Sequence, residues 1–222
     1  AKGKKIVNYQ LSDFDDIKIT EQGFLVHLNT YVFEIPFLGE FNLSNVLAAL
    51  NSVVAFGFDK TQVIPLLHQL LPPPGRMQKI NKHLAWVDYA HTPDALDNAI
   101  RTLQQHYPDF KVRVVFGCGG NRDQTKRAKM GKIASALAST IILTNDNPRS
   151  EDPQAIINDI LSGIDDSYEL DIIQDRKLAI ETAITTLQED ECLLIAGKGH
   201  ESTQTIGETV LAMNDIKIAQ NA

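Results

Sequence analysis

Four short segments of this chain combine glycines with charged and amide side chains. Each follows a run of apolar residues, and the four are Tyr89-Ala90-His91, Gly117-Cys118-Gly119-Gly120-Asn121-Arg122-Asp123, Asn145-Asp146-Asn147-Pro148-Arg149 and Gly197-Lys198-Gly199-His200-Glu201. Arg122 and Arg149 could each bind a carboxylate through a fork of two N–H groups. Asp146 and Glu201 could bind ammonium groups, and the glycines would let a ligand approach the backbone closely. This mixture of charges predicts a zwitterionic ligand rather than an apolar one.

Each segment also has a simpler structural explanation. Glycines are common after strands because tight turns often require positive φ, and Arg122 beside Asp123 could be a surface ion pair that contributes little. His91 and His200 could be ordinary loop histidines, since no cluster of carboxylates or cysteines accompanies them as metal ligands. Four such segments in one sheet are harder to explain by turns alone. We therefore favour a binding site and expect no metal in it.

Neither common phosphate-binding loop is present. The segments that begin at Gly117 and Gly197 both lack the last glycine of G-x-G-x-x-G, and G-x-x-x-x-G-K-[ST] does not occur in the sequence. If the protein uses ATP, we expect the loop that holds its triphosphate to lie outside this sequence.

The apolar runs and the segments between them predict an α/β fold. The expected strands are 84–88, 112–116, 141–144 and 192–196, and the expected helices are roughly 93–105, 126–138, 153–162 and 176–188. Thr92-Pro93 and Asp152-Pro153 each place a capping side chain before a proline, which is typical of a helix start. This alternation predicts a mostly parallel sheet with helices on both faces. Since ligands bind at the carboxyl ends of such strands, the four polar segments should converge on one crevice.

The first part of the chain follows a different pattern. Its predicted elements are a β-hairpin with strands 24–28 and 31–35 joined at Asn29-Thr30, a helix over 42–50 that stops at Gly57, and a helix from Asp59 that kinks at Pro65. The run Pro72-Pro73-Pro74-Gly75 can continue neither a helix nor a central strand. We therefore predict two domains, residues 1–74 and residues 75–222.

Composition narrows the classes of protein that the chain can belong to. It has 222 residues, of which 43% are hydrophobic, and 21 basic against 28 acidic residues give a net charge of −7. A nucleic-acid partner is therefore not expected, and no apolar run reaches the roughly 18 residues of a membrane span. Cys118 and Cys192 have no companions at zinc-site spacing. We expect a cytoplasmic protein with reduced thiols, and a disulfide between the two cysteines is the alternative.

Read together, these motifs resemble those of the Mur ligases, which add amino acids to the peptidoglycan precursor. The resemblance covers residues 42–201 and follows the order of the family. It rests on the four polar segments and on Asn42-Leu43-Ser44-Asn45, Gly75-Arg76-Met77 and Asp88-Tyr89-Ala90-His91-Thr92-Pro93. The Asp-Asn-Pro-Arg box at 146–149 is the most diagnostic element, because it resembles the version that selects meso-diaminopimelate.

The resemblance implies a fold and an activity. Residues 1–74 would be the C-terminal part of a central ATPase domain, and residues 75–222 a Rossmann-like amino-acid-binding domain. The activity would be an ATP-dependent ligation of meso-diaminopimelate to UDP-N-acetylmuramoyl-L-alanyl-D-glutamate through an acyl phosphate, with ATP and Mg²⁺ as cofactors. Because the uridine-nucleotide domain, the phosphate loop and the magnesium ligands would lie elsewhere, we expect no catalytic residue and no ligase activity in this chain alone. The expected partners are these small molecules, and the expected oligomeric state is a monomer.

The matching motifs also imply roles for individual residues. The amino-acid pocket would consist of Arg122, Asp146, Asn147, Pro148, Arg149, Gly197 and Glu201, and the ATP contacts of Asn45, Arg76, Asp88 and His91. Within these sets, Asn45 would contact adenine and Asp88 the ribose. Arg149 would bind the distal carboxylate that lysine lacks. Asn121 stands where some relatives are expected to carry an acidic residue, which leaves Arg122 without one orienting neighbour.

The sequence leaves three alternatives to a diaminopimelate-adding Mur ligase. A lysine-adding homologue should depart from the terminal arginine of the Asp-Asn-Pro-Arg box, and a folylpolyglutamate synthetase-like ligase should lack the box altogether. A non-catalytic module that binds an amino acid or a nucleotide would need no catalytic residues. The complete motif set favours the diaminopimelate-adding ligase.

Overall fold

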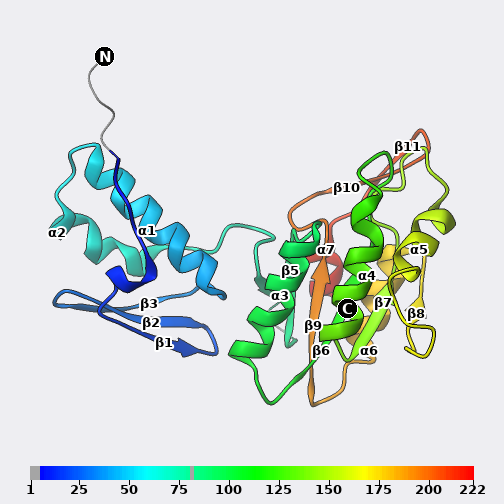
Figure 1. Cartoon of the computed structure of the whole chain (residues 1–222), viewed down its shortest axis with the longest axis horizontal. Coiled ribbons are helices and arrows are strands. Elements are labelled where there is room, and N and C mark those ends of the chain that lie inside the picture. The colour runs from blue at the N-terminus through cyan, green and yellow to red at the C-terminus, as the bar shows by residue number, and fades with distance from the viewer. Residues whose placement is uncertain (1–5, 81–82) are drawn as a thin grey trace. The chain divides into compact units, whose positions relative to one another are not determined.

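A computed structural model of the chain describes residues 6–80 and 83–222 (Figure 1). The chain divides into two compact units, Ala1–Pro72 and Pro73–Ala222. The division falls within the proline run of residues 72–74, where neither a helix nor a central strand can continue.

The N-terminal unit is a three-stranded antiparallel sheet covered by helices. Its elements are the 3-10 helix η1 (Leu11–Asp13), β1 (Asp16–Thr20), β2 (Gly23–Leu28), β3 (Tyr31–Ile35), α1 (Glu40–Ala55), α2 (Lys60–Val63) and the 3-10 helix η2 (Ile64–Gln69). The sheet order is β1-β2-β3, and Leu28 pairs with Tyr31 across the turn. The predicted hairpin is therefore confirmed, and Asn29 adopts the positive φ of 57° that such a turn requires.

Two helix predictions for this unit have different outcomes. The first helix ends as predicted, because Gly57 follows it with a φ of 104°. Asp59 caps α2 through a hydrogen bond from the Thr61 N–H, also as predicted. The predicted kink at Pro65 is instead a change of helix type, since the chain passes from α2 into η2 there. Proline has no N–H to continue the α-helical ladder.

The C-terminal unit is built on a six-stranded sheet of order β4-β5-β9-β6-β7-β8. Its strands are β4 (Gln78–Ile80), β5 (Ala85–Asp88), β6 (Lys111–Phe116), β7 (Thr140–Leu143), β8 (Asp171–Ile172) and β9 (Glu191–Ala196). Only β4 runs antiparallel to its neighbour, and all the other pairs are parallel. The chain returns late to insert β9 between β5 and β6, so the ends of β5, β9, β6 and β7 lie next to one another.

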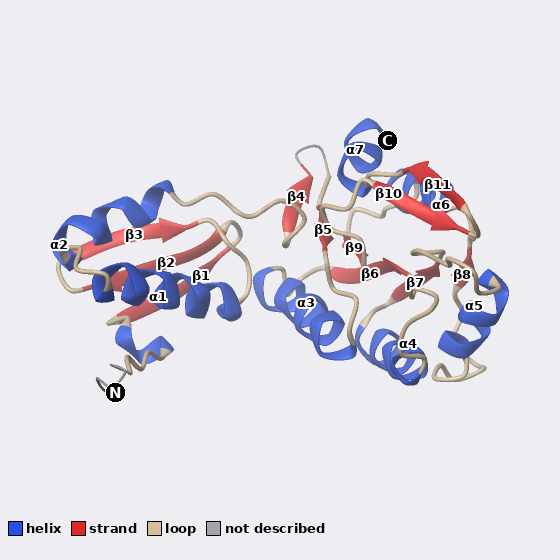
Figure 2. Ribbon diagram, turned by 90° about the horizontal axis from the view of Figure 1, so that it is seen from above, coloured by secondary structure: helices blue, strands red, loops and turns tan. Residues whose placement is uncertain are grey.

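Helices cover both faces of this sheet, as the sequence predicts. They are α3 (Pro93–His106), α4 (Thr125–Leu137), α5 (Pro153–Leu161), α6 (Arg176–Thr185) and α7 (Asp215–Asn221). Figure 2 shows α3, α4 and α5 along one face and α6 and α7 along the other. Thr92 and Asp152 cap α3 and α5 through their side chains, which confirms both predicted helix starts. A separate hairpin of β10 (Thr203–Ile206) and β11 (Thr209–Ala212) follows β9.

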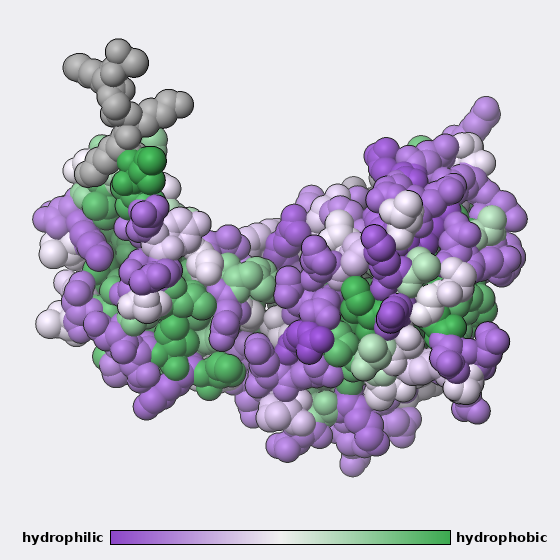
Figure 3. Space-filling view, in the orientation of Figure 1, coloured by the Kyte–Doolittle hydropathy of each residue, from purple (hydrophilic) through white to green (hydrophobic). Residues whose placement is uncertain are grey.

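The core of this unit consists mainly of apolar strand residues, and the buried Arg113 in the centre of β6 is paired with Glu191 of β9 at 2.6 Å. Every residue of β9 is buried, and Val115, Ile142 and Ile195 pack against Ala179 and Ile180 of α6. Figure 3 shows hydrophilic surface predominating over the upper edge of this unit, the edge toward which β9 points in Figure 1.

Candidate functional site

The four polar segments meet at one pocket of about 390 Å³ in the C-terminal unit. The predicted convergence is therefore confirmed, because the pocket is lined from the loops that follow β5, β6, β7 and β9. The lining residues are Tyr89, His91, Thr92, Gly119, Arg122, Asp123, Lys126, Asp146, Asn147, Arg149, Gly197 and Glu201. A second cavity, lined by residues of α6, α7 and the β10–β11 hairpin, is less polar and receives none of these loops.

Most of the residues expected in an amino-acid pocket line this one. Arg122, Asp146, Asn147, Arg149, Gly197 and Glu201 do so, together with His91 from the set expected to contact ATP. Pro148 belongs to the same loop but does not line the pocket, and the predicted ligand roles of all these residues remain predictions.

Arg149 is held in an unusual backbone conformation by its neighbours. Its φ is 54°, its N–H donates to the Thr205 carbonyl at 3.0 Å, and its own carbonyl accepts from the Gly207 N–H at 2.6 Å. Its Nη1 donates to the Gly120 carbonyl at 2.7 Å. The sequence predicts that this guanidinium binds a carboxylate through two N–H groups. In the structure, one of its nitrogens is already used to hold the loop. The remaining N–H groups of Arg149 can face a ligand.

The loop after β6 is tied to the loop after β7 by Gly120 and Asn121. The Gly120 N–H donates to the Asn147 carbonyl at 2.9 Å, and a Cβ at this position would collide with the Pro148 carbonyl. Asn121 has a φ of 54°, and its Oδ1 accepts from the N–H and the hydroxyl of Ser150 at 3.2 and 3.0 Å. Asn121 thus connects the loop after β6 to the loop after β7 through hydrogen bonds. Its carbonyl also accepts from Arg122, so the arginine keeps a local contact.

Asp123 does not pair with Arg122, so the simpler interpretation of that dipeptide as a surface ion pair is wrong. The Oδ1 of Asp123 instead accepts from the N–H of Thr125 at 2.9 Å and from its hydroxyl at 2.7 Å. These two hydrogen bonds hold the pKa of Asp123 below its ordinary value. The carboxylate therefore stabilises the start of α4, and Arg122 stays available to the pocket.

The glycine loop after β9 brings backbone and carboxylates close together. Gly197 has a φ of 117°, and a Cβ there would lie 2.7 Å from an oxygen of Asp146. Glu201 Oε2 accepts from the Asn147 amide at 3.0 Å and from the Lys198 ammonium at 2.9 Å. Burial alone would raise the pKa of Glu201, but the charge and hydrogen bond of Lys198 bring it below its ordinary value. Glu201 is therefore an ionised carboxylate at neutral pH.

Three of the four residues expected to contact ATP gather around Tyr89. The Arg76 guanidinium lies 4.7 Å from the centre of the Tyr89 ring, and the ring of His91 contacts the same ring. Asp88 ends β5 and accepts from the Met77 N–H at 2.7 Å. Burial raises the pKa of Asp88, although this hydrogen bond and the charge of Arg76 act in the opposite direction.

The fourth residue, Asn45, belongs to the N-terminal unit. It is exposed on α1 and donates to Asn42 Oδ1 at 3.4 Å. Its predicted role toward adenine remains a prediction.

Comparison with known proteins places this geometry in a family. Residues 75–199 match the family model described as Mur ligase, glutamate ligase domain. The chain belongs to the Mur ligase family. Curated relatives of this Mur ligase chain include UDP-N-acetylmuramoyl-L-alanyl-D-glutamate--2,6-diaminopimelate ligases of Rickettsia bellii and Trichormus variabilis. The first is 45% identical over 88% of this chain and 41% of the relative, and the second 42% identical over 86% and 39%. The chain thus spans about two fifths of the length of the curated relatives it matches.

Solved structures agree with this assignment. A structure of UDP-N-acetylmuramoyl-L-alanyl-D-glutamate--2,6-diaminopimelate ligase has a TM-score of 0.68 and 37% identity, covering 94% of this chain and 44% of the other. Mycobacterium tuberculosis folylpolyglutamate synthase complexed with ADP has a TM-score of 0.65 at 22% identity, covering 84% of this chain and 45% of the other, which shows a shared fold. The predicted α/β class and the predicted family are both confirmed.

The loops of the Mur ligase pocket are held by buried charged residues that the sequence analysis did not predict. Arg127 is 1% exposed, and it donates to Glu151 at 2.8 Å, to Asp159 at 2.8 Å and to the Gly119 carbonyl at 3.3 Å. It therefore supports the glycine-rich loop from below. An arginine at a helix start resembles a solvated residue in sequence, and its spacing from Met130 and Ala134 was the one available signal of an inward face.

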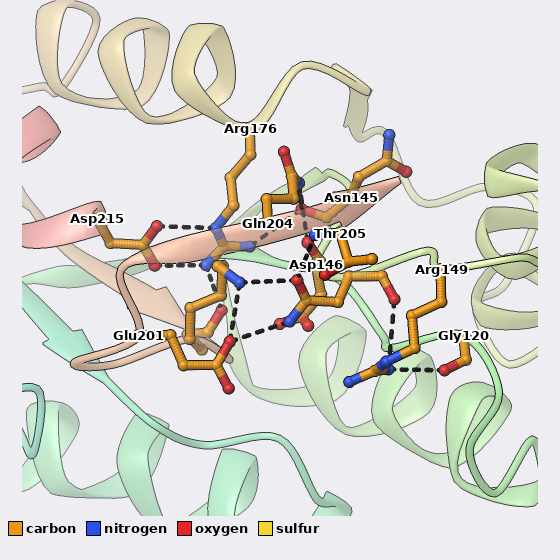
Figure 4. A network of polar contacts seen from close by, with 12 residues as sticks. Gly120, Asn145, Asp146, Arg149, Arg176, Glu201, Gln204, Thr205 and Asp215 are labelled. Atoms are coloured by element: carbon orange, nitrogen blue, oxygen red, sulfur yellow. Dashed lines mark hydrogen bonds and ion pairs between the residues drawn. The ribbon is translucent and has the colours of Figure 1, made fainter. Parts of the chain in front are cut away.

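A second support lies beneath the loop after β7 (Figure 4). The Gln204 amide donates to the carbonyls of Asn145 and Asp146 at 3.2 and 2.8 Å. Arg176 donates to the Asn145 carbonyl at 3.4 Å and forms a two-point ion pair with Asp215. None of these partners is near in sequence, so periodicity could not have indicated them.

Within residues 6–80 and 83–222, no group of three His, Cys, Asp or Glu side chains could hold a metal ion. The same residues include no helix that is long and apolar enough to cross a membrane. Cys118 and Cys192 are free and buried, and burial raises the pKa of each thiol to about 12.

Proposed function

We propose that this chain supplies the amino-acid pocket of an ATP-dependent ligase that adds meso-diaminopimelate to UDP-N-acetylmuramoyl-L-alanyl-D-glutamate in peptidoglycan synthesis. The observation that carries the proposal is the pocket itself, whose charged lining residues are Arg122, Arg149, Lys126, Asp123, Asp146 and Glu201. Asp123 is engaged by Thr125 and Lys126 by the His91 carbonyl, which leaves two guanidiniums and two carboxylates for a ligand with two carboxylates and two ammonium groups. The names of the curated relatives support this choice of substrate.

In the proposed complex, Arg149 and Arg122 bind the carboxylates of the incoming amino acid, and Asp146 and Glu201 bind its ammonium groups. Asn147 and the Gly197 backbone complete the contacts, and Pro148 fixes the loop. One amine, after losing its proton, attacks the activated carboxyl carbon of the peptide. A C–N bond forms as the C–O bond to phosphate breaks, and phosphate leaves. The pocket contributes by holding the amine in position for this attack.

ATP, when bound, supplies the phosphoryl group that activates the peptide carboxylate. Arg76, Asp88 and His91 fit a nucleotide, since they present a cation, a buried carboxylate and an aromatic ring around Tyr89. The described residues do not fit a magnesium site, because they hold no suitable group of ligands. The sequence also lacks a phosphate loop of the G-x-x-x-x-G-K-[ST] type, so we expect the chain alone to release no ADP. We also propose that the enzyme is a cytoplasmic monomer, and two unpaired thiols agree with that compartment.

Calorimetric titration with meso-diaminopimelate and L-lysine tests the proposal. Lysine lacks the second carboxylate, and one lost charged hydrogen-bonded contact costs about 1.5–3 kcal/mol, so lysine should bind roughly 10- to 150-fold more weakly. Arg149→Ala should abolish that difference. Arg101→Ala, which removes an exposed arginine of α3 outside the pocket, should leave it intact.

Equal affinity of the wild-type chain for the two amino acids would refute the role of Arg149 and favour a lysine-adding enzyme. Binding of neither would contradict an amino-acid pocket within this chain. ADP release by the chain alone, dependent on the peptide substrate and diaminopimelate, would overturn the expectation that it is inactive by itself.

A further inference from the structure

Lys198 carries a fully buried ammonium group beneath the pocket. Its side chain has no exposed surface, and its Nζ lies 2.9 Å from Glu201 Oε2 and 3.2 Å from Asn147 Oδ1. A buried charge is costly unless it is paired and hydrogen-bonded, and both of these partners are residues that line the pocket. Lys198 therefore contacts two lining residues from beneath and does not itself line the pocket.

The network around Asn147 allows only one orientation of its amide. Oδ1 accepts from Lys198 and from the Thr205 N–H at 3.0 Å, whereas Nδ2 donates to Glu201 at 3.0 Å. Turning the amide over would set its NH₂ group against two donors and its oxygen against a carboxylate. The ammonium of Lys198 thus fixes Asn147 as well as Glu201.

Both contacts to Glu201 use the same oxygen. Oε2 accepts from Lys198 and from Asn147, and within the described residues no hydrogen bond to a side chain or backbone group reaches Oε1. The Glu201 side chain is 33% exposed and lines the pocket, so its second oxygen remains available there. One oxygen of Glu201 is thus held by Lys198 and Asn147, and the other is available to bind a ligand in the pocket.

Other charges surround this pair from the neighbouring elements. Arg149, from the loop after β7, and Arg176, from the start of α6, both interact electrostatically with Glu201. Asp146 interacts with Arg176 and lines the same pocket as Glu201. Asp215 of α7 compensates Arg176 through its two-point ion pair (Figure 4). Lys198 is consequently the cation that is hydrogen-bonded directly to Glu201 among the described residues.

We propose that Lys198 is a positioning residue that keeps Glu201 ionised and aimed at the ammonium group of the incoming amino acid. This inference rests on the proposed function, because it takes the ligand to be an amino acid. Lys198 would act through Glu201 and Asn147, with no contact to the ligand of its own. Its loss should therefore change how binding depends on pH, which a purely structural role would not do.

The first test needs no ligand. In ¹³C NMR of the wild-type chain, the Glu201 side-chain carboxyl, assigned by comparison with Glu201→Gln, should titrate below the usual range for glutamate. In Lys198→Met it should titrate at higher pH, because burial remains and the opposite charge is gone. Lys198→Arg should retain the low value, and Lys177→Met, which removes an exposed lysine of α6, is the matched control.

The second test measures the affinity for meso-diaminopimelate at about pH 8 and about pH 5, where an ordinary glutamate is partly protonated. Wild type should bind similarly at both. Lys198→Met should lose roughly tenfold or more on going to the lower pH, as a protonated Glu201 cannot form the charged hydrogen bond. The double variant Lys198→Met/Glu201→Gln, which replaces both charges, should bind weakly and without this extra pH dependence.

The outcomes separate the two proposals. An unchanged Glu201 titration in Lys198→Met, or an equal loss of affinity at both pH values, would overturn the role of Lys198 while leaving the amino-acid pocket intact. Absence of binding by wild type at both pH values would instead overturn the proposed function and the ligand assigned here with it. A shifted titration together with a steeper pH dependence would support both.

Discussion

The buried ion pair between Arg176 and Asp215 should be a principal determinant of the stability of the C-terminal unit. Both side chains are completely buried, with Nε to Oδ1 at 2.9 Å and Nη2 to Oδ2 at 2.7 Å. Two further hydrogen bonds from Arg176 reach the carbonyls of Asn145 at 3.4 Å and Ala196 at 3.0 Å. Asp215→Ala would leave a buried guanidinium with these two carbonyls and no counter-charge.

The expected magnitude follows from that geometry. Removal of one partner of a buried pair costs about 3–5 kcal/mol, and the two remaining carbonyl contacts place Asp215→Ala at the lower end, near 3 kcal/mol. The double variant Arg176→Met/Asp215→Leu removes both charges and should lie much closer to wild type. Asp97→Ala, which breaks the exposed pair with Arg101, should cost at most about 1 kcal/mol.

Urea denaturation followed by the fluorescence of Trp86 provides the measurement. Trp86 is the single tryptophan of the chain and is buried in β5, so its signal reports on the C-terminal unit. With a urea dependence of about 2 kcal/mol per molar, a loss of 3 kcal/mol would lower the midpoint by about 1.5 M. A midpoint for Asp215→Ala no lower than that of Asp97→Ala would refute the argument that this buried pair stabilises the unit.

Three further predictions concern single positions near the pocket. Gly197→Ala should destabilise the unit by about 1–3 kcal/mol, because alanine is strained at a φ of 117°. It should also weaken amino-acid binding, because its Cβ would press on Asp146. Chemical denaturation would measure the first effect and calorimetry the second. Cys118 and Cys192 should resist thiol reagents in the native chain and react after unfolding, since burial raises the pKa of each to about 12; rapid labelling of the native chain would contradict this. Asp88→Asn should stabilise the chain at neutral pH, because burial raises the pKa of this carboxyl and makes its ionised form costly in the folded state. The gain should vanish as pH falls below the ordinary value of 3.8, and denaturation curves across pH would test it.

The parts of the fold that could be predicted from sequence are those with a long apolar signal. The runs at 112–116 and 192–196 are buried almost throughout, and the structure places strands over both. β8 has two residues, both exposed, and β11 has four exposed residues, so neither offers an apolar alternation. These short elements form because their neighbours provide hydrogen-bonding partners, which a local pattern cannot show.

The residues of the site also divide into those with a local sequence signal and those whose placement depends on distant contacts. Arg122, Arg149 and Glu201 could be found because each lies in a loop that follows a buried strand, and the carboxyl ends of parallel strands meet at one edge of the sheet. Arg127 and Lys198 could not, since a charged side chain in a loop or a helix start resembles a solvated one. Their burial is decided by partners 3 to 51 residues away, as the contacts of Lys198 with Glu201 and Asn147 illustrate.

The β10–β11 hairpin stabilises the pocket without being part of the six-stranded sheet. It pairs with no strand of the six-stranded sheet, yet it supplies the Thr205 carbonyl and the Gly207 N–H that bracket Arg149. A left-handed conformation costs a non-glycine residue about 1–2 kcal/mol, which two backbone hydrogen bonds and the Gln204 contacts to the same loop can offset. Without the hairpin, Arg149 would lose the two backbone hydrogen bonds that hold its positive φ, although Gly120 and Asn121 would still tie the loop. The selectivity attributed to the Asp-Asn-Pro-Arg box therefore depends on a segment more than 50 residues later in the chain, whose own sequence carries no binding motif.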